Sequence, residues 1–235
     1  MPGYIMHLTE AKLICSKLRE AGLPVSEKWE HCFQIGALLP DSKQRGEKQG
    51  SHFWNPASLD RLAIAPDLRL FHRKYGRDFT DPLMLGYRAH LQMDTAYVEE
   101  YWDKIVEFLD ADGRPAVLRD QITTARIKKT GQMIPREDFF SRNYYYGDYS
   151  RSNCWLMEKY GIRLPAYDPA MTCPIEEVSI EDMRQILDEL QELLLHCSLE
   201  TVKDLRVFDP DSLTQFVETC AERETGEIMK QISGT

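Results

Sequence analysis

The chain has 235 residues, of which 43% are hydrophobic and 29% charged, proportions that are typical of a globular protein in water. Its formal net charge of -9 argues against a stable nucleic-acid partner, because affinity for a polyanion rests mainly on basic contacts to phosphates. No run of about 18 apolar residues occurs, so no membrane span is predicted. The N-terminus lacks a basic segment followed by an apolar one, and we therefore expect no signal peptide and a cytoplasmic location.

The six cysteines are scattered along the chain, and no two of them form a C-x-x-C pair. This usage favours small buried thiols in a reducing compartment. A disulfide framework remains the alternative interpretation.

The first 40 residues predict two helices. An apolar stripe from His7 to Leu18 indicates a first helix that ends near Gly22. Ser26 is a suitable N-cap for a second helix, and Pro40 ends it.

A loop and two shorter helical pieces are predicted next. Residues 41–56 are polar and contain glycine, which is typical of a loop. Residues 59–64 and 66–75 read as short helices, and Gly76 is the expected C-cap of the second.

One long helix is predicted from Asp81 to Leu109. Asp81 is its expected cap and Pro82 occupies the first turn, while the acidic, Gly-containing residues 110–113 close it. Side chains spaced by three and four residues share one apolar face of this helix: Leu83, Tyr87, His90, Asp94, Tyr97, Tyr101, Ile105 and Phe108.

The rest of the chain also predicts helices, over residues 116–130, from the Tyr-rich stretch 143–155 onward, near 176–197 and near 210–231. Strand signals are sparse and we find no internal repeat, so the predicted fold class is all-α. We expect a single domain over residues 1–235, in which residues 1–160 form the core that carries the candidate site. Residues 175–235 then add a C-terminal helical pair.

The pair His90 and Asp94 is the most informative feature of the long helix. A bare carboxylate on an apolar face would cost several kcal/mol to bury, so Asp94 needs a partner or a cation. A histidine one turn away is a suitable second ligand for a metal ion. The ordinary alternative is a surface pair four residues apart, which contributes a few tenths of a kcal/mol.

Three further residues, His7, Asp41 and His52, complete a candidate metal-binding set. Zinc binds imidazole nitrogen and carboxylate oxygen in sites of about four ligands, and a catalytic site keeps one position for water. The D-x10-H and H-x3-D spacings supply two histidines and two aspartates, and His7 could extend the set to a second metal bridged by Asp94. Taken singly, each of these residues has an ordinary structural explanation.

These motifs, in this chain order, resemble the bacterial zinc-dependent phospholipase C family, whose all-helical fold is shared with secreted zinc nucleases acting on single strands. The resemblance covers roughly the first 100 residues. It implies a phospholipase C/nuclease-like helical bundle with a zinc cluster, and it makes Asp41 both a ligand and a candidate general base. The resembling segments are YIMHLTEA at His7, GALLPD at Asp41, SHF at His52, and GYRAHLQMD at His90 and Asp94.

The chain also departs from that family. No histidine occurs between Asp94 and His196, so the further zinc position that the secreted enzymes build after the H-x3-D helix is absent or rebuilt. The family uses its processed N-terminal residue as a ligand, and we expect no leader here whose removal would expose one. The resemblance therefore implies a cytoplasmic relative with one or two zinc ions.

The predicted function is a metal-dependent phosphoester hydrolase that acts on a small soluble phosphoester through metal-activated water. In the polar loop, Lys43, Arg45 and Lys48 could hold a phosphate, and Lys43 and Arg45 are the candidate substrate-binding residues. Tyr146 and Asp148 could line a pocket, with Asp148 as an extra ligand or acid. A solvated loop and simple packing of tyrosine rings are the alternatives for these two segments.

Two other functions are alternatives to this prediction. A helical phosphohydrolase of the His-Asp dipeptide type is disfavoured, because the chain contains no such dipeptide. A non-catalytic helical protein that retains the phospholipase C-like fold, with or without a structural metal, remains open. The metal content of the purified protein would separate the two.

Overall fold

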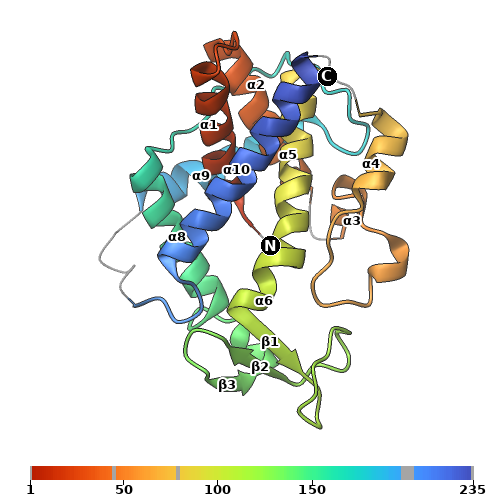
Figure 1. The fold of residues 1–235 in the computed structure, drawn as a ribbon, viewed down its shortest axis with the longest axis vertical. Helices are drawn as coiled ribbons and strands as arrows, with labels where there is room; N and C mark the ends of the chain where they lie inside the picture. Colours follow the sequence, from red (N-terminus) through yellow and green to blue (C-terminus); the bar gives the residue numbers. More distant parts are fainter. Residues whose placement is uncertain (1, 44–45, 78–79, 197–203, 234–235) are drawn as a thin grey trace.

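The computed structural model of the chain describes residues 2–43, 46–77, 80–196 and 204–233, and it is mainly helical (Figure 1). None of the helices in these ranges is long and apolar enough to cross a membrane. The α-helices are α1 (Tyr4–Glu20), α2 (Glu27–Leu38), α3 (Lys48–Ser51), α4 (Leu68–Tyr75), α5 (Pro82–Ala96), α6 (Trp102–Ile105), α7 (Arg136–Phe139), α8 (Tyr145–Tyr160), α9 (Met183–Leu195) and α10 (Pro210–Ser233).

Three predicted helix ends are confirmed. The Ser26 side chain accepts a hydrogen bond from the backbone N–H three residues later and starts α2. Asp81 caps α5 in the same way, at 3.0 Å. Gly76 ends α4 with a φ of 83°, a backbone conformation that favours glycine. The local capping chemistry was therefore readable from the sequence.

The single helix predicted from Asp81 to Leu109 is only partly correct. It ends at Ala96, and a π-helical turn, η3 (Tyr97–Tyr101), and the short α6 follow. From Val106 the chain is extended as strand β1 (Val106–Leu109). An apolar run of this kind suits a buried strand as well as a helix, and pairing with another strand decides between the two.

A small antiparallel sheet makes the fold mainly α rather than all-α. Its order is β1-β2-β3, with β2 (Thr124–Ile127) in the centre and β3 (Met133–Pro135) at the edge. Residues 116–130, predicted to be helical, supply the central strand instead, where Arg126 pairs with Glu107 of β1 at 2.9 Å. The sheet lies at one end of the molecule, below the helices in Figure 1.

The described residues also contain short 3-10 turns. The 3-10 helices are η1 (Leu39–Ser42), η2 (Pro56–Ser58) and η4 (Ile180–Asp182). The helix predicted over residues 59–64 does not form. A 3-10 turn, η2, lies just before that segment; it begins at Pro56 and is capped by the Asn55 side chain.

Helices α2 and α5 cross in backbone contact at two glycines. A Cβ placed on Gly36 would lie 2.1 Å from the carbonyl oxygen of Leu83, and one placed on Gly86 would lie 2.1 Å from the carbonyl oxygen of Phe33. Only glycine permits backbones to approach this closely. The crossing brings the last turn of α2 against the middle of α5, where His90 lies.

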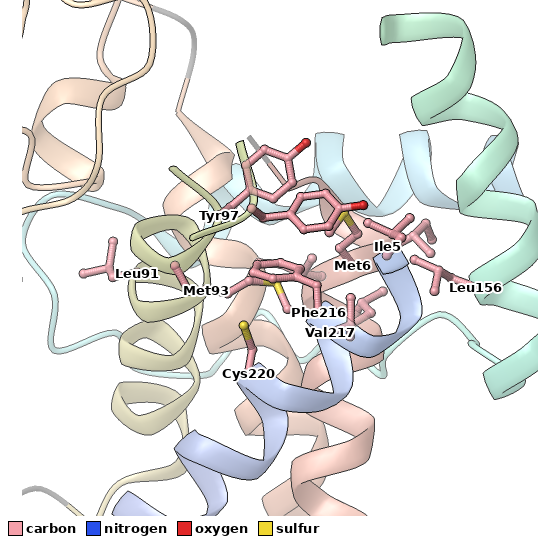
Figure 2. Packing of buried hydrophobic residues seen from close by; sticks show 14 of the residues in the cluster. Ile5, Met6, Leu91, Met93, Tyr97, Leu156, Phe216, Val217 and Cys220 are labelled. Atoms are coloured by element: carbon pink, nitrogen blue, oxygen red, sulfur yellow. The ribbon is translucent and has the colours of Figure 1, made fainter. Parts of the chain in front are cut away.

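The last helix, α10, packs into the same core as the first. Figure 2 shows Phe216, Val217 and Cys220 of α10 beside Ile5 of α1 and Met93 of α5. A buried ion pair, in which Arg88 donates two hydrogen bonds to Glu224 Oε1, ties α5 to α10. The helix that carries the candidate ligands is thus held from both sides.

The expectation of reduced thiols is wrong for Cys154, which is disulfide-bonded. Cys15, Cys32, Cys173 and Cys220 are free thiols. Burial raises the pKa of the Cys15 thiol to about 12, which keeps it protonated and unreactive.

Candidate metal centre

Four elements bring the five predicted ligands into one buried cluster. His7 comes from α1, Asp41 from η1, and His52 from the residue that ends α3. His90 and Asp94 lie one turn apart on α5. Asp41 is 9% exposed, and the other four are at most 1% exposed, so the cluster reaches solvent at Asp41.

The ligand atoms of this cluster have the spacing of a zinc site. His52 Nε2 lies 3.3 Å from His90 Nε2, 3.4 Å from Asp41 Oδ1 and 3.6 Å from Asp94 Oδ2. Ligand atoms at about 2.0–2.1 Å from a tetrahedral zinc ion lie about 3.3 Å from one another. The ligand atoms of Asp41, His52 and His90 are therefore close enough to share one ion, and Asp94 Oδ2 lies beside both imidazoles.

The outer nitrogens of His52 and His90 are held by oxygen atoms that fix the tautomer of each ring. His90 Nδ1 lies 2.8 Å from the carbonyl oxygen of Ala37, which can only accept, so Nδ1 carries the proton. The Ser51 hydroxyl donates to the carbonyl of Pro40 at 2.7 Å, which leaves Ser51 Oγ to accept from His52 Nδ1 at 3.0 Å. Such contacts orient metal-binding histidines in proteins generally.

Consequently the two Nε2 atoms face each other at 3.3 Å with a lone pair each and no proton between them. Burial, and next the neighbouring His7, lower the pKa of His90 from its usual 6.5 to about 3, so His90 itself is neutral at neutral pH. A bound cation would relieve the contact between the two lone pairs. This contact is the strongest sign that the cluster is built for a metal ion.

Asp94 divides its carboxylate between the two sides of the cluster. Oδ1 lies 3.5 Å from His7 Nε2, whereas Oδ2 lies 3.6 Å from His52 Nε2 and 3.8 Å from His90 Nε2. Within the described residues, neither oxygen of Asp94 and neither ring nitrogen of His7 has a hydrogen-bond partner. This is the orientation of a bridging carboxylate, and buried groups left in this state call for a cation.

The two possible metal positions are unequal. One combines Asp41, His52 and His90, and the other combines His7, His90 and Asp94. Because His90 offers only Nε2, it can serve one ion, and its approach to His52 assigns it to the first position. His7 and Asp94 Oδ1 are then the two described ligand atoms left for a second ion.

Asp41 stands at the solvent side of the cluster beside Lys48. Although burial opposes ionisation, the neighbouring His52 and the Lys48 charge hold the pKa of Asp41 well below its usual range. Burial, and next the Asp41 charge, raise the pKa of Tyr4 and Tyr149, which places both tyrosines near this carboxylate. Both remain neutral phenols, and the Tyr4 hydroxyl donates its hydrogen bond to Glu189 Oε2 at 3.1 Å.

The predicted substrate-binding residues have mixed outcomes. Lys43 pairs with Asp182 of η4 at 2.7 Å, and Arg45 lies outside the described residues. Tyr146 is 44% exposed and its ring packs on Phe140.

The structure gives Asp148 a different task from the predicted one. Its Oδ2 accepts hydrogen bonds from the backbone N–H groups of Arg206, Val207 and Phe208, and its Oδ1 pairs with Arg151. The side chain is fully buried and does not belong to the metal-ligand groups. Its role as a ligand or acid is therefore not supported, and its acceptor capacity fixes the segment before α10.

Ser51 is the site residue that the sequence reasoning missed. Its hydroxyl sets the His52 tautomer, and the only signal for it in the sequence is its place directly before His52. A cavity of about 370 Å³ also lies beside the end of α5, lined by Arg61, Arg69, Thr95 and Glu99 among others. No cluster ligand lines it, so the chemistry favours the buried cluster over this cavity.

Comparison of the chain with protein-family models, with curated proteins and with solved structures finds no match. The interpretation of the cluster therefore rests on its own geometry and on the order of the sequence motifs that build it.

Proposed function

We propose that this chain is a metal-dependent phosphoester hydrolase with its main zinc position between Asp41, His52, His90 and Asp94. One observation carries the proposal: two imidazole Nε2 atoms approach to 3.3 Å while both Nδ1 atoms are committed to oxygen partners. The donor set is all nitrogen and oxygen, which suits zinc in a catalytic site.

Each residue has a defined task in this proposal. Zinc in such a site acts as a Lewis acid and lowers the pKa of a bound water to about 7. The Ala37 carbonyl and Ser51 hold the two imidazoles in the tautomer that presents Nε2. Asp41, the most exposed member, is a ligand on the side from which substrate arrives, and it is also the candidate general base.

The reaction class is proposed from the order of the motifs. The G-A-x-x-P-D, H-F and G-x-x-x-H-x-x-x-D segments occur in the order in which the phospholipase C and single-strand nuclease families use them. The proposed fold is a cytoplasmic variant of that helical bundle. Because the ligands are nearly closed off from solvent, we expect a small phosphoester as substrate.

One observation favours a second candidate, a non-catalytic protein with a structural metal. Asp94 Oδ2 lies 3.6 Å from His52 Nε2, and if it joined Asp41, His52 and His90 on one ion, the four ligands would form a closed zinc site. In that case no coordination position remains for water. The exposure of Asp41 at the edge of the cluster is the reason to prefer the catalytic proposal.

Metal analysis and an activity screen separate these candidates. We expect purified protein to contain zinc by mass spectrometry and to hydrolyse nitrophenyl phosphate, bis(nitrophenyl) phosphate or a short single-stranded oligonucleotide. Chelation should abolish hydrolysis and added zinc should restore it. His52→Gln should lose both zinc and activity. The control is His196→Gln, which should lose neither, because the His196 side chain is 77% exposed.

The outcomes are distinct. Stoichiometric zinc without hydrolysis of any ester would favour the structural metal. Protein that binds no divalent metal, in which chelator and added zinc leave the melting temperature unchanged, would refute the metal centre itself.

A further inference from the structure

Lys48 is fixed at the solvent side of the cluster by the same turn that carries His52. It is the first residue of α3, and the backbone N–H of His52 donates to its carbonyl oxygen at 2.9 Å. Its Nζ lies 2.5 Å from Asp41 Oδ1, and its side chain is 25% exposed against 7% for Asp41. A cation therefore lies between the ligand cluster and solvent.

The charge balance of the cluster suggests that the Lys48 ammonium group attracts an anion. One bound divalent ion would offset the two carboxylates of Asp41 and Asp94, because metal-ligating histidines are neutral. Such a centre carries no net charge and has no general attraction for an anion. The ammonium group of Lys48 makes the centre net positive on the side that faces solvent.

The ammonium group also has donors to spare. Lysine has three N–H donors, and Asp41 is the one acceptor that the described residues provide for Lys48. A metal ion on Asp41 would share the negative charge of its carboxylate and weaken the ion pair. The lysine would then be able to turn its donors to an incoming anion.

We propose that Lys48 binds the terminal phosphoryl group of a phosphomonoester dianion at the solvent side of the metal centre. This assignment rests on the proposed function, since it names the substrate class of the same site. A lysine acts as a compact point charge on phosphate, and the doubly charged monoester gains more from it than a singly charged diester. Of the three loop cations in the sequence, Lys43 is already paired with Asp182.

The test uses zinc-loaded protein and inorganic phosphate as the probe, measured by calorimetry. Lys48→Met keeps the aliphatic stem and removes the charge. We expect it to weaken phosphate binding about 10- to 100-fold, the loss typical of a hydrogen bond to a charged group. Lys48→Arg should retain most of the affinity.

A matched control is Lys74→Met, because Lys74 pairs with Glu176 and Glu177 on the surface. It should leave phosphate affinity unchanged. Zinc affinity distinguishes anion binding from a purely structural role, because loss of a structural lysine would weaken zinc binding. Lys48→Met should instead bind zinc as tightly as wild type or more tightly, because the ammonium group no longer competes for Asp41. In steady-state assays, its KM for nitrophenyl phosphate should rise more than its KM for bis(nitrophenyl) phosphate.

The possible failures are separable. If wild type binds no phosphate, or Lys48→Met binds it as tightly as wild type, the assignment of Lys48 is wrong whatever the hydrolysis assays show. A Lys48→Met protein that loses zinc would also overturn it, by showing a role in building the site. If phosphate binds through Lys48 but no ester is hydrolysed, the hydrolase proposal fails while the anion site stands.

Discussion

The glycine contact between α2 and α5 makes a prediction that joins the fold to the metal centre. In Gly86→Ala, the new Cβ would lie 2.1 Å from the Phe33 carbonyl oxygen and 2.9 Å from the backbone nitrogen of Ala37. Both neighbours are backbone atoms, so no side chain can turn aside. The two helices must therefore separate.

The size of the effect follows from that separation. Opening the contact from 2.1 Å to at least 3.0 Å moves the helices apart by about 1 Å. The His90 Nδ1 hydrogen bond to the Ala37 carbonyl, now 2.8 Å, would then exceed hydrogen-bond length. Overpacking costs about 1–3 kcal/mol and the lost hydrogen bond about 1 kcal/mol, offset by about 1 kcal/mol of better helix propensity.

We expect a net loss of about 2 kcal/mol, or a melting temperature lower by about 4–8 °C for a chain of this size. Zinc affinity should fall about 10- to 100-fold, the usual cost of losing the contact that orients a metal-binding histidine. Thermal unfolding monitored by circular dichroism and zinc titration against a competing chelator measure the two effects. Gly226→Ala is the control, because a Cβ there meets nothing within 4 Å and should stabilise α10 slightly. A Gly86→Ala protein with wild-type stability and zinc affinity would refute the reasoning.

Three further predictions address the site and its support. His52→Gln should remove the stabilisation by bound zinc, about 4 kcal/mol at a free zinc concentration 1,000 times the Kd, so chelator should lower the melting temperature of wild type but not of this variant. Arg88→Met should lower the free energy of unfolding, measured in denaturant, by about 3–5 kcal/mol, because Glu224 stays buried without its cation. Adding Glu224→Gln should recover part of the loss. Equal stability of the single and double variants would argue against the pair. Asp148→Ala should lower stability by about 3 kcal/mol or more, because three backbone N–H groups lose their acceptor, yet leave zinc affinity intact in the folded protein; loss of zinc from a folded variant would return Asp148 to the metal site.

The sequence by itself determined the features that depend on near neighbours in the chain. Ser26, Asp81 and Gly76 mark helix ends because capping involves only a few consecutive residues. The H-x3-D spacing places His90 and Asp94 on one helical face by geometry alone. Both were predicted from the sequence and both are present in the structure.

Tertiary structure decided what depends on partners distant in sequence. Val106 to Leu109 continues an apolar pattern that suits a helix, yet it pairs with β2, because hydrogen bonding to another strand outweighs a weak local preference. Asp148 was an attractive ligand by residue type, but its carboxylate is committed to backbone groups about sixty residues later in the chain. No local pattern could indicate either partner.

The same distinction applies within the metal centre. Residue types and order predicted the five candidate ligands, and the fold brings them together. The tautomers of His52 and His90, in contrast, depend on the carbonyls of Pro40 in η1 and Ala37 in α2. The Lys48 contact with Asp41 likewise exists because a single turn folds back onto η1. The candidate ligands can be predicted from residue types, whereas the protonation of their rings and their access to solvent depend on backbone atoms and charges that only the fold brings within a few ångströms.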